Sequence, residues 1–282
     1  MTRLILLTLV GTLAVHAQQA PLSALEIVKR SVERDTRNFE RFKDYTFHQF
    51  NEQKQLDKSG KVTRSERELD EVLMLGGRPY SRVLERNGKP LSEKENSREQ
   101  AKLDKEAAKR AKESKRDQAK YEKERLEERR FTREIPDAFS FTMLNQETID
   151  GLPVWKIQAN PKPGFKPRDG RADLLKQVRG TLWIDQAGYQ WVRADIDVIG
   201  TISWGLFVLR IPPGATISFA QTRVNEEVWL PKQIHVRADA KLALLKTFRM
   251  DLDVAYSNYR KFRAESQVLD VQEIPSPLAN PK

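Results

Sequence analysis

Two pairs of carboxylates are the residues of this chain whose spacing could serve catalysis or metal binding. Asp195 and Asp197 alternate along one stretch of sequence, and Asp251 and Asp253 alternate along another. Paired carboxylates can bind Ca²⁺ or act as an acid and a base. Exposed alternating positions on two β-strands explain the same spacing more simply, and we expect that arrangement here.

The content of histidine and cysteine argues against a catalytic or metal centre. The chain has no Cys and three His, which excludes disulfides, thiolate metal sites and a Cys nucleophile. His48 and His235 lie far apart in the sequence, and we do not expect them to share a site. We therefore expect a protein that is not an enzyme and that uses neither a cofactor nor a metal ion.

The composition predicts a folded chain with an unusually polar surface. Its 282 residues suffice for one large domain or two small ones. Charged residues make up 32%, yet 12 Phe, 6 Tyr and 5 Trp are too many for a disordered chain. The formal net charge of +10 favours anionic partners.

The first residues have the pattern of a secretory signal peptide. A basic start at Arg3 is followed by an apolar stretch from Leu4 to Val15 and by the small residue Ala17. This stretch is too short to span a bilayer, which takes about 20 residues. We expect residues 1–17 to be cleaved near Ala17 and the protein to be periplasmic or secreted. For a protein outside the cytoplasm, the anionic partners we expect are lipid headgroups, lipopolysaccharide or cell-wall polymers, and not nucleic acid.

The elements that must hold any site begin with an amphipathic helix over 22–40. Ser23 and Glu26 have the spacing of a capping box. Its apolar face is formed by Leu25, Val28, Val32 and Phe39. From residue 44 the period changes to two, which predicts a strand near 45–50 and two polar strands near 61–74 and 78–86 that carry charges on both faces.

A charged insertion occupies residues 92–134. It is rich in Lys, Arg, Glu and Ala, which favour helix, and it lacks Gly and Pro up to Pro136. A single helix over 92–130 would be about 58 Å long and would overhang its own domain unless it breaks. A solvated helix, a partner-binding arm and a nucleic-acid-binding helix remain open, in decreasing order of preference. We expect 95–130 to be helical but loosely attached, because large apolar residues are scarce in it.

Residues 139–259 read as consecutive strands with turn signals and no helix between them, which predicts an antiparallel sheet that curls on itself. The predicted fold is therefore α+β and mostly β: a half-barrel of about 10–11 strands with an N-terminal helix and a long charged helical insertion. The half-barrel is expected to comprise 18–91 and 135–262, and 263–282 to be a C-terminal tail.

Several strand-and-turn motifs resemble the periplasmic lipoprotein-carrier family of LolA-like half-barrels, which includes outer-membrane lipoprotein-sorting proteins. The motifs are the segments 150–155, 180–185, 229–232 and 256–260, with the sequences DGLPVW, GTLWID, WLPK and YSNYR. The chain looks most similar to an uncharacterised secreted bacterial subgroup. The resemblance implies a curled sheet with helices across its concave face and an apolar cavity between them. The resemblance does not identify which residues of this sequence would contact a ligand.

Two sets of residues are candidates for binding. The apolar set could line a lipid cavity or pack as ordinary core; it comprises Trp155, Trp183, Trp204, Phe207, Phe219, Phe248 and Met250. The basic set lies in a loop stiffened by prolines and could contact anionic headgroups or serve as a solvated connector; it comprises Lys162, Lys166, Arg168 and Arg171.

Two functions fit these features. The first is a non-enzymatic periplasmic carrier that binds a lipid or the acyl part of a lipoprotein. The second is an envelope interaction or sensor module, in which the charged arm at 92–134 binds a protein or an anionic polymer.

Overall fold

A computed structural model of the chain describes residues 22–204, 209–242 and 246–261. The helices are α1 (Ala24–Arg41), α2 (Glu93–Ala111), α3 (Lys115–Glu128) and α4 (Ile135–Ala138), with 3₁₀ turns η1 (Phe42–Asp44), η2 (Arg130–Glu134) and η3 (Gly170–Gln177). The strands are β1 (Tyr45–Leu56), β2 (Val62–Leu75), β3 (Arg78–Arg86), β4 (Lys89–Pro90), β5 (Phe139–Ile149), β6 (Leu152–Pro161), β7 (Val178–Asp185), β8 (Trp191–Val198), β9 (Ile202–Trp204), β10 (Leu209–Ile211), β11 (Thr216–Val224), β12 (Val228–Leu242) and β13 (Lys246–Lys261).

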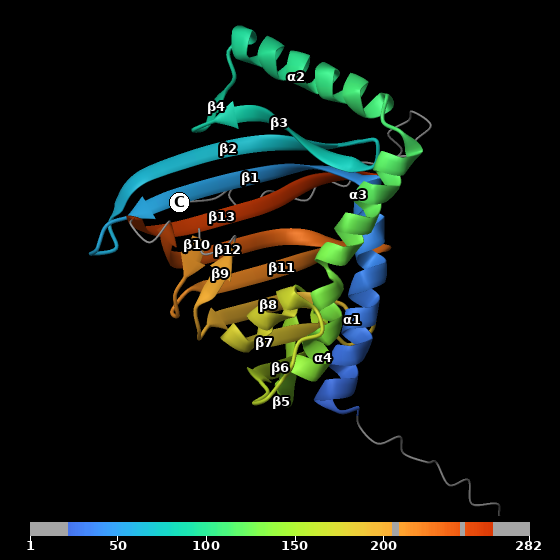
Figure 1. The fold of residues 1–282 in the computed structure, drawn as a ribbon, viewed down its shortest axis with the longest axis vertical. Helices are drawn as coiled ribbons and strands as arrows, with labels where there is room; N and C mark the ends of the chain where they lie inside the picture. The colour runs from blue at the N-terminus through green and yellow to red at the C-terminus, as the bar shows by residue number, and fades with distance from the viewer. Residues whose placement is uncertain (1–21, 205–208, 243–245, 262–282) are drawn as a thin grey trace, which may run out of the picture.

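All the strands belong to one open antiparallel sheet. Eleven of them follow the order β4-β3-β2-β1-β13-β12-β11-β8-β7-β6-β5, and β9 and β10 branch from β12. The sheet is strongly curved, and α1 lies across it (Figure 1). The predicted half-barrel with an N-terminal helix is confirmed. The two polar strands predicted near 61–74 and 78–86 are β2 and β3, close to one edge.

Helix α1 defines what we call the inner face of the sheet. The helix begins at Ser23, whose Oγ accepts a hydrogen bond from the backbone N of Glu26 at 3.2 Å. Ile27 and Val28 are fully buried. They form one cluster with side chains of β6, β7 and β8, namely Ile157, Leu182, Ile184 and Ala194. Because successive strand residues alternate, these four side chains fix which residues of each strand face α1.

A buried amide joins the C-terminal half of α1 to the sheet. The Asn38 side chain accepts a hydrogen bond from the backbone N of Trp229 at 2.8 Å and donates one to the carbonyl of the same residue. Both backbone groups belong to β12, and Asn38 is 9% exposed. A buried amide that satisfies two backbone groups at once sets the position of the helix along the strand.

The outer face of the sheet carries a buried apolar cluster around Trp183 and, elsewhere, charged side chains that are largely paired. Asp195 and Asp197 lie on it, beside Arg193 at 2.6 Å and Arg179 at 3.1 Å respectively. Asp251 lies on the same face and pairs with Arg237 at 2.8 Å. Asp197 is exposed, as the simpler interpretation of the spacing predicted, whereas Asp251 is buried at 6% exposure and does not fit it. The charges of Asp195, Asp197 and Asp251 are compensated by same-strand and cross-strand ion pairs.

The charged insertion folds back on the protein. It is helical, as predicted, but it breaks at residues 112–114 into α2 and α3. Ser114 caps α3 by accepting a hydrogen bond from the backbone N of Asp117 at 3.2 Å. Helix α2 lies along β3 at the edge of the sheet, and α3 runs beside α1 (Figure 1). Because the helix breaks here, the insertion does not extend beyond the domain as a single long helix would.

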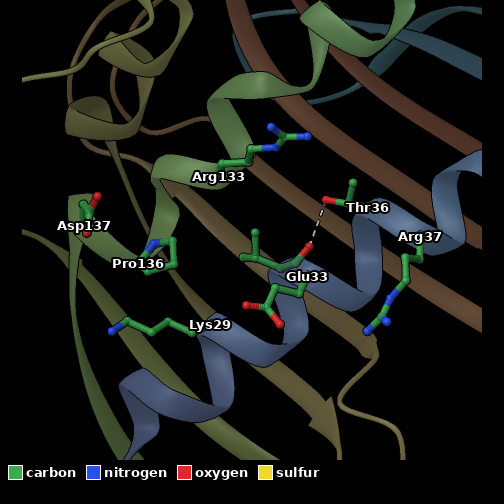
Figure 2. Close-up of a pocket in the computed structure, with 8 residues that line it drawn as sticks. Lys29, Glu33, Thr36, Arg37, Arg133, Pro136 and Asp137 are labelled. Carbon is green, nitrogen blue, oxygen red and sulfur yellow. Dashed lines mark hydrogen bonds between the residues drawn. The ribbon is translucent and has the colours of Figure 1, made fainter.

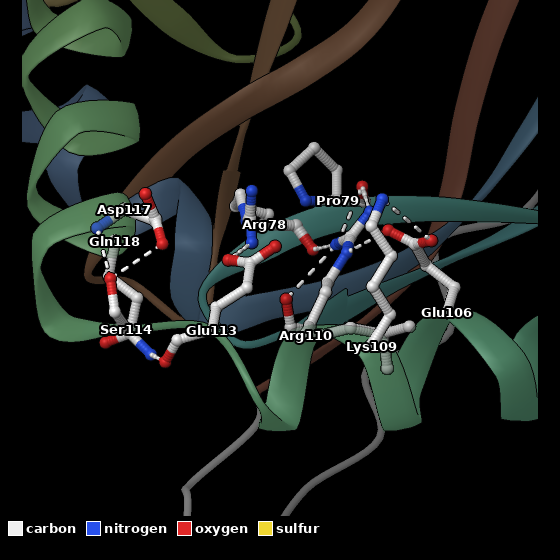
Figure 3. Close-up of polar contacts among 10 residues, drawn as sticks. Arg78, Pro79, Glu106, Lys109, Arg110, Glu113, Ser114, Asp117 and Gln118 are labelled. Atoms are coloured by element: carbon white, nitrogen blue, oxygen red, sulfur yellow. Dashed lines mark hydrogen bonds and ion pairs between the residues drawn. The ribbon is translucent and has the colours of Figure 1, made fainter.

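Polar contacts attach α2 and α3 to the rest of the molecule (Figure 3). The Arg110 guanidinium donates to the backbone carbonyls of Leu75 at 3.2 Å and Arg78 at 2.8 Å. Arg78 forms an ion pair with Glu113 and stacks over the ring of Tyr121, 4.8 Å from its centroid. These contacts fix α2 and the start of α3 at the turn between β2 and β3.

A second group of contacts joins α3 and the residue that follows it to α1. Arg125 and Arg129 stack over the ring of Phe39 at 4.5 and 4.3 Å from its centroid, and Arg129 also forms an ion pair with Asp35. Within α2 and α3, Glu99 is the one buried residue. The insertion is thus attached by charge and cation–π contacts and buries little apolar area.

A buried carboxyl lies near the attachment of α2. Asp70 of β2 is 5% exposed, and burial raises its pKa to about 6, with Glu68 and Glu99 adding like charge. Arg86 opposes this shift, and Asn51 donates a hydrogen bond to Asp70 at 3.2 Å. The carboxyl is therefore charged at neutral pH in an environment that disfavours the charge.

We predict that salt loosens α2 while leaving the sheet intact. Raising NaCl from about 0.05 M to about 1 M shortens the Debye length to about 3 Å and weakens partly exposed ion pairs. Amide hydrogen exchange should accelerate in 93–111 and stay unchanged in β7 and β13. The substitution Arg110→Gln should accelerate the same amides at low salt, whereas Lys105→Gln, which alters an exposed residue of the same helix, should not. Exchange in α2 that responds to neither salt nor Arg110→Gln would contradict this attachment.

We predict a pH-dependent gain in stability from Asp70→Asn. The pKa of Asp70 is raised from 3.8 to about 6 on folding, so its proton is held more tightly in the folded state and stability falls as pH rises between these values. At pH 8 the substitution should raise Tm by about 2–4 °C, corresponding to about 1 kcal/mol. Near pH 4 the gain should vanish, because Asp70 is then protonated in the folded state. The control Asp197→Asn removes an exposed carboxylate and should give no such gain; equal gains at both pH values would refute the role of burial.

Candidate functional site

An apolar strip crosses the inner face of the sheet beside α1. The register aligns Ile196, Ile217, Val236 and Leu252 in one row over β8, β11, β12 and β13, and Phe219 and Ile234 in the next row. All six are half-buried. On the neighbouring strand β1 the same face carries Gln49, Asn51 and Gln53. The strip is therefore an incompletely covered apolar surface with a polar border.

The predicted apolar residues divide between the two faces. Trp155, Phe219 and Met250 lie on the inner face, where Trp155 packs against Tyr189 with ring centroids 5.4 Å apart. The register places Trp183 on the outer face, so it lies apart from these three. Its indole is flanked there by Lys156 and Arg193, and its Nε1 donates to Glu147 at 2.9 Å. The Glu147 pKa is lowered to about 2, chiefly by the Lys156 hydrogen bond and then by the Trp183 one.

For two of the remaining predicted apolar residues the structure describes the backbone position, and the third lies outside the described residues. Trp204 ends β9, and Phe248 pairs with Ala240 in the register of β12 and β13. Phe207 lies outside the described residues. The predicted signal peptide at 1–17 and the predicted tail at 263–282 also lie outside them.

The predicted basic loop is anchored on α4. Lys162 donates its backbone N–H to the carbonyl of Ala138 at 2.8 Å and its Nζ to that of Pro136 at 3.4 Å. Arg168 forms an ion pair with Asp137 at 2.8 Å, and the loop backbone is held by the buried Glu134, which accepts the N–H of Arg168 at 2.9 Å. Lys166 and Arg171 are exposed.

A cavity of about 590 Å³ opens between α1 and the η2–α4 segment, next to this loop (Figure 2). Charged side chains come from both walls, whereas the buried Val32 and Pro136 are the apolar part of the lining. The charged lining residues are Lys29, Glu33 and Arg37 from α1 and Arg133 and Asp137 from the opposite wall. The volume is within the range of about 300–1,000 Å³ typical of small-molecule sites.

The sequence contains a partial signal for this cavity. Lys29, Glu33 and Arg37 recur every four residues along α1 and therefore share one face of the helix. Such a pattern is typical of a solvated helix face, and nothing in it indicates that Arg133 approaches from another segment. The cavity was accordingly missed, and a tertiary contact was needed to reveal it.

One group of metal-ligating types occurs among the described residues, on the outer face. His235 Nδ1 lies 2.7 Å from Asp253 Oδ1 and 3.7 Å from Asp251 Oδ1. Asp251 is already paired with Arg237, which lowers the negative charge available to a cation. His48 lies on β1, two strands away from His235 on β12. The ion pair of Asp251 with Arg237 and the hydrogen bond between His235 and Asp253 account for the arrangement.

Comparisons with known proteins identify structures of similar architecture. No protein-family model matches the sequence, and no curated protein sequence matches it. A DUF1329 family protein from Desulfovibrio piger is 13% identical, with 86% of this chain and 95% of that chain covered and a TM-score of 0.34. A LolA superfamily protein from Nitrosomonas europaea is 11% identical, with 87% and 96% covered and a TM-score of 0.30. MucB in its complex with MucA from Pseudomonas aeruginosa is 9% identical, with 86% and 99% covered and a TM-score of 0.23.

These similarities concern the fold. The LolA superfamily, which the strand-and-turn motifs resembled, recurs among the similar structures, and this chain's curved antiparallel sheet with a helix across one face has the expected arrangement. No helix within the described residues has the length and apolar character needed to cross a bilayer.

Proposed function

We propose that this protein is a non-enzymatic carrier of the bacterial cell envelope that binds a lipid, or the acyl part of a lipoprotein, along the inner face of its sheet. The observation that carries the proposal is the apolar strip over β8, β11, β12 and β13, whose large side chains stay half-buried beside α1. The location outside the cytoplasm follows from the predicted signal peptide, which directs export.

An acyl chain suits the shape and chemistry of the strip. The row Ile196–Ile217–Val236–Leu252 crosses four adjacent strands, and the row Phe219–Ile234 crosses two of them. Together they offer a long apolar floor and not a compact pocket. Each methylene group buried against such a surface contributes about 0.8 kcal/mol. The polar residues of β1 mark where the apolar strip ends beyond β13.

The carrier is favoured over the interaction module by the contacts of the insertion. Arg110, Arg125 and Arg129 direct their contacts to β3 and α1 of the same chain. Residues engaged in this way support the sheet edge and the helix that lies on the inner face. A partner-binding role for α2 and α3 would have to use their exposed side chains, which are mixed in charge.

We predict that the inner face binds acyl chains and that Phe219 contributes to the binding. Protein exported and purified from the periplasm should carry a lipid in native mass spectrometry. After delipidation it should bind a fluorescent sixteen-carbon fatty acid. The substitution Phe219→Gln places a polar side chain on the strip and should weaken this binding about tenfold, which corresponds to about 1.4 kcal/mol.

The matched control is Phe50→Gln, which alters a half-buried aromatic residue of β1 on the outer face. It should leave binding within about twofold of the unsubstituted protein if the ligand lies on the inner face. Protein that carries no lipid and binds no fatty acid would refute the proposal, and so would equal losses in the two variants. Circular dichroism would establish that both variants are folded.

A further inference from the structure

The cavity between α1 and the η2–α4 segment has an excess of positive charge. Three cations line it, Lys29, Arg37 and Arg133, together with the two carboxylates Glu33 and Asp137. Figure 2 shows these side chains on the two facing walls. A concave site with an excess of one charge attracts ligands of the opposite charge.

Neighbouring contacts increase this excess. Asp137 is paired with Arg168 at 2.8 Å, so its charge is compensated from outside the cavity. The nearby Asp35 is paired with Arg129, and the buried Glu134 accepts the backbone N–H groups of Arg168 and Asp169. Among the described lining residues, Glu33 is then the carboxylate left to balance three cations.

The cavity adjoins the apolar strip. Val32, on its lining, belongs to the same buried cluster as Ala194. Ala194 is in turn the register partner of Phe219 on β11. Ile135, which precedes the lining residue Pro136, packs against both this cluster and the one that includes Val198 and Ala238. The charged cavity and the apolar floor thus have neighbours in the same buried core.

We infer that this cavity binds the phosphate of an amphiphile whose acyl chain lies on the apolar strip. The inference rests on the proposed function and narrows its ligand to a phosphate-bearing amphiphile in place of a neutral acylglycerol. Arg37 and Arg133 can each donate two N–H groups to phosphate oxygens, and Lys29 adds an ammonium. Glu33, between Lys29 and Arg37 on α1, is positioned to orient these two cations or to accept an ammonium of the head group.

A pair of amphiphiles with the same chain tests the inference. Dodecyl phosphate and dodecanol share their apolar part, so the ratio of their affinities reports the head group alone. We expect the full mature protein to bind dodecyl phosphate at least about tenfold more tightly, since one hydrogen bond between charged groups is worth that factor. Arg133→Gln and Arg37→Gln should each bring the ratio toward one. Arg34→Gln, which alters an exposed arginine of the same helix outside the lining, should leave it unchanged.

The outcomes separate this inference from the proposed function. Equal affinities for the two amphiphiles would overturn the phosphate site while leaving the acyl-binding function intact. If the protein binds neither dodecanol nor dodecyl phosphate, both the phosphate site and the acyl-binding function are overturned. Inorganic phosphate alone should bind far more weakly than dodecyl phosphate; if it binds equally well, the cavity serves free phosphate and the assignment to an amphiphile is wrong. A ratio lowered equally by Arg34→Gln would show a general charge effect and would also overturn the site.

Discussion

The contact between α1 and the inner face of the sheet sets the positions of the other elements. An open, curved sheet exposes one apolar face along its whole width, and this face has to be covered by other parts of the chain or by a ligand. Helix α1 covers β6, β7 and β8 through Ile27 and Val28 and is held to β12 by Asn38. Because α1 crosses the strands, it leaves the apolar strip beside it half-buried.

Ion pairs and arginine contacts position the segments that the core does not hold. Since the chain is rich in Arg, Lys, Glu and Asp, much of its surface is held by ion pairs across the outer strands and by arginine contacts under the insertion. Such contacts contribute little stability individually, but they determine where segments lie. Arg168 illustrates this role, because its pairing with Asp137 both anchors the basic loop and leaves the cavity beside α1 more positive.

Much of the fold could be predicted from the sequence, because its signals are local. The capping residue Ser23 and the apolar period of α1 predicted a helix that begins within two residues of the observed one, and the period of two predicted the strands. The break at 112–114 has a local signal as well, since Ser114 and Asp117 have capping spacing. The face occupied by Trp183 could not be predicted, because a shift of one residue in register exchanges the two faces. The cavity depended on the approach of Arg133 to α1, which is a tertiary contact.

The two edges of the sheet differ in a way that limits self-assembly. Sheets of separate molecules join by pairing free edge strands, and growth into a fibre needs two such edges on every molecule. At one end of this sheet α2 lies against β3, and Arg110 donates to backbone carbonyls at the turn between β2 and β3. At the other end β5 pairs with β6 alone among the described strands, with Leu144 49% exposed. The strand at the opposite end, β4, has two residues, whereas β5 has eleven, so pairing with a second sheet is favoured at β5.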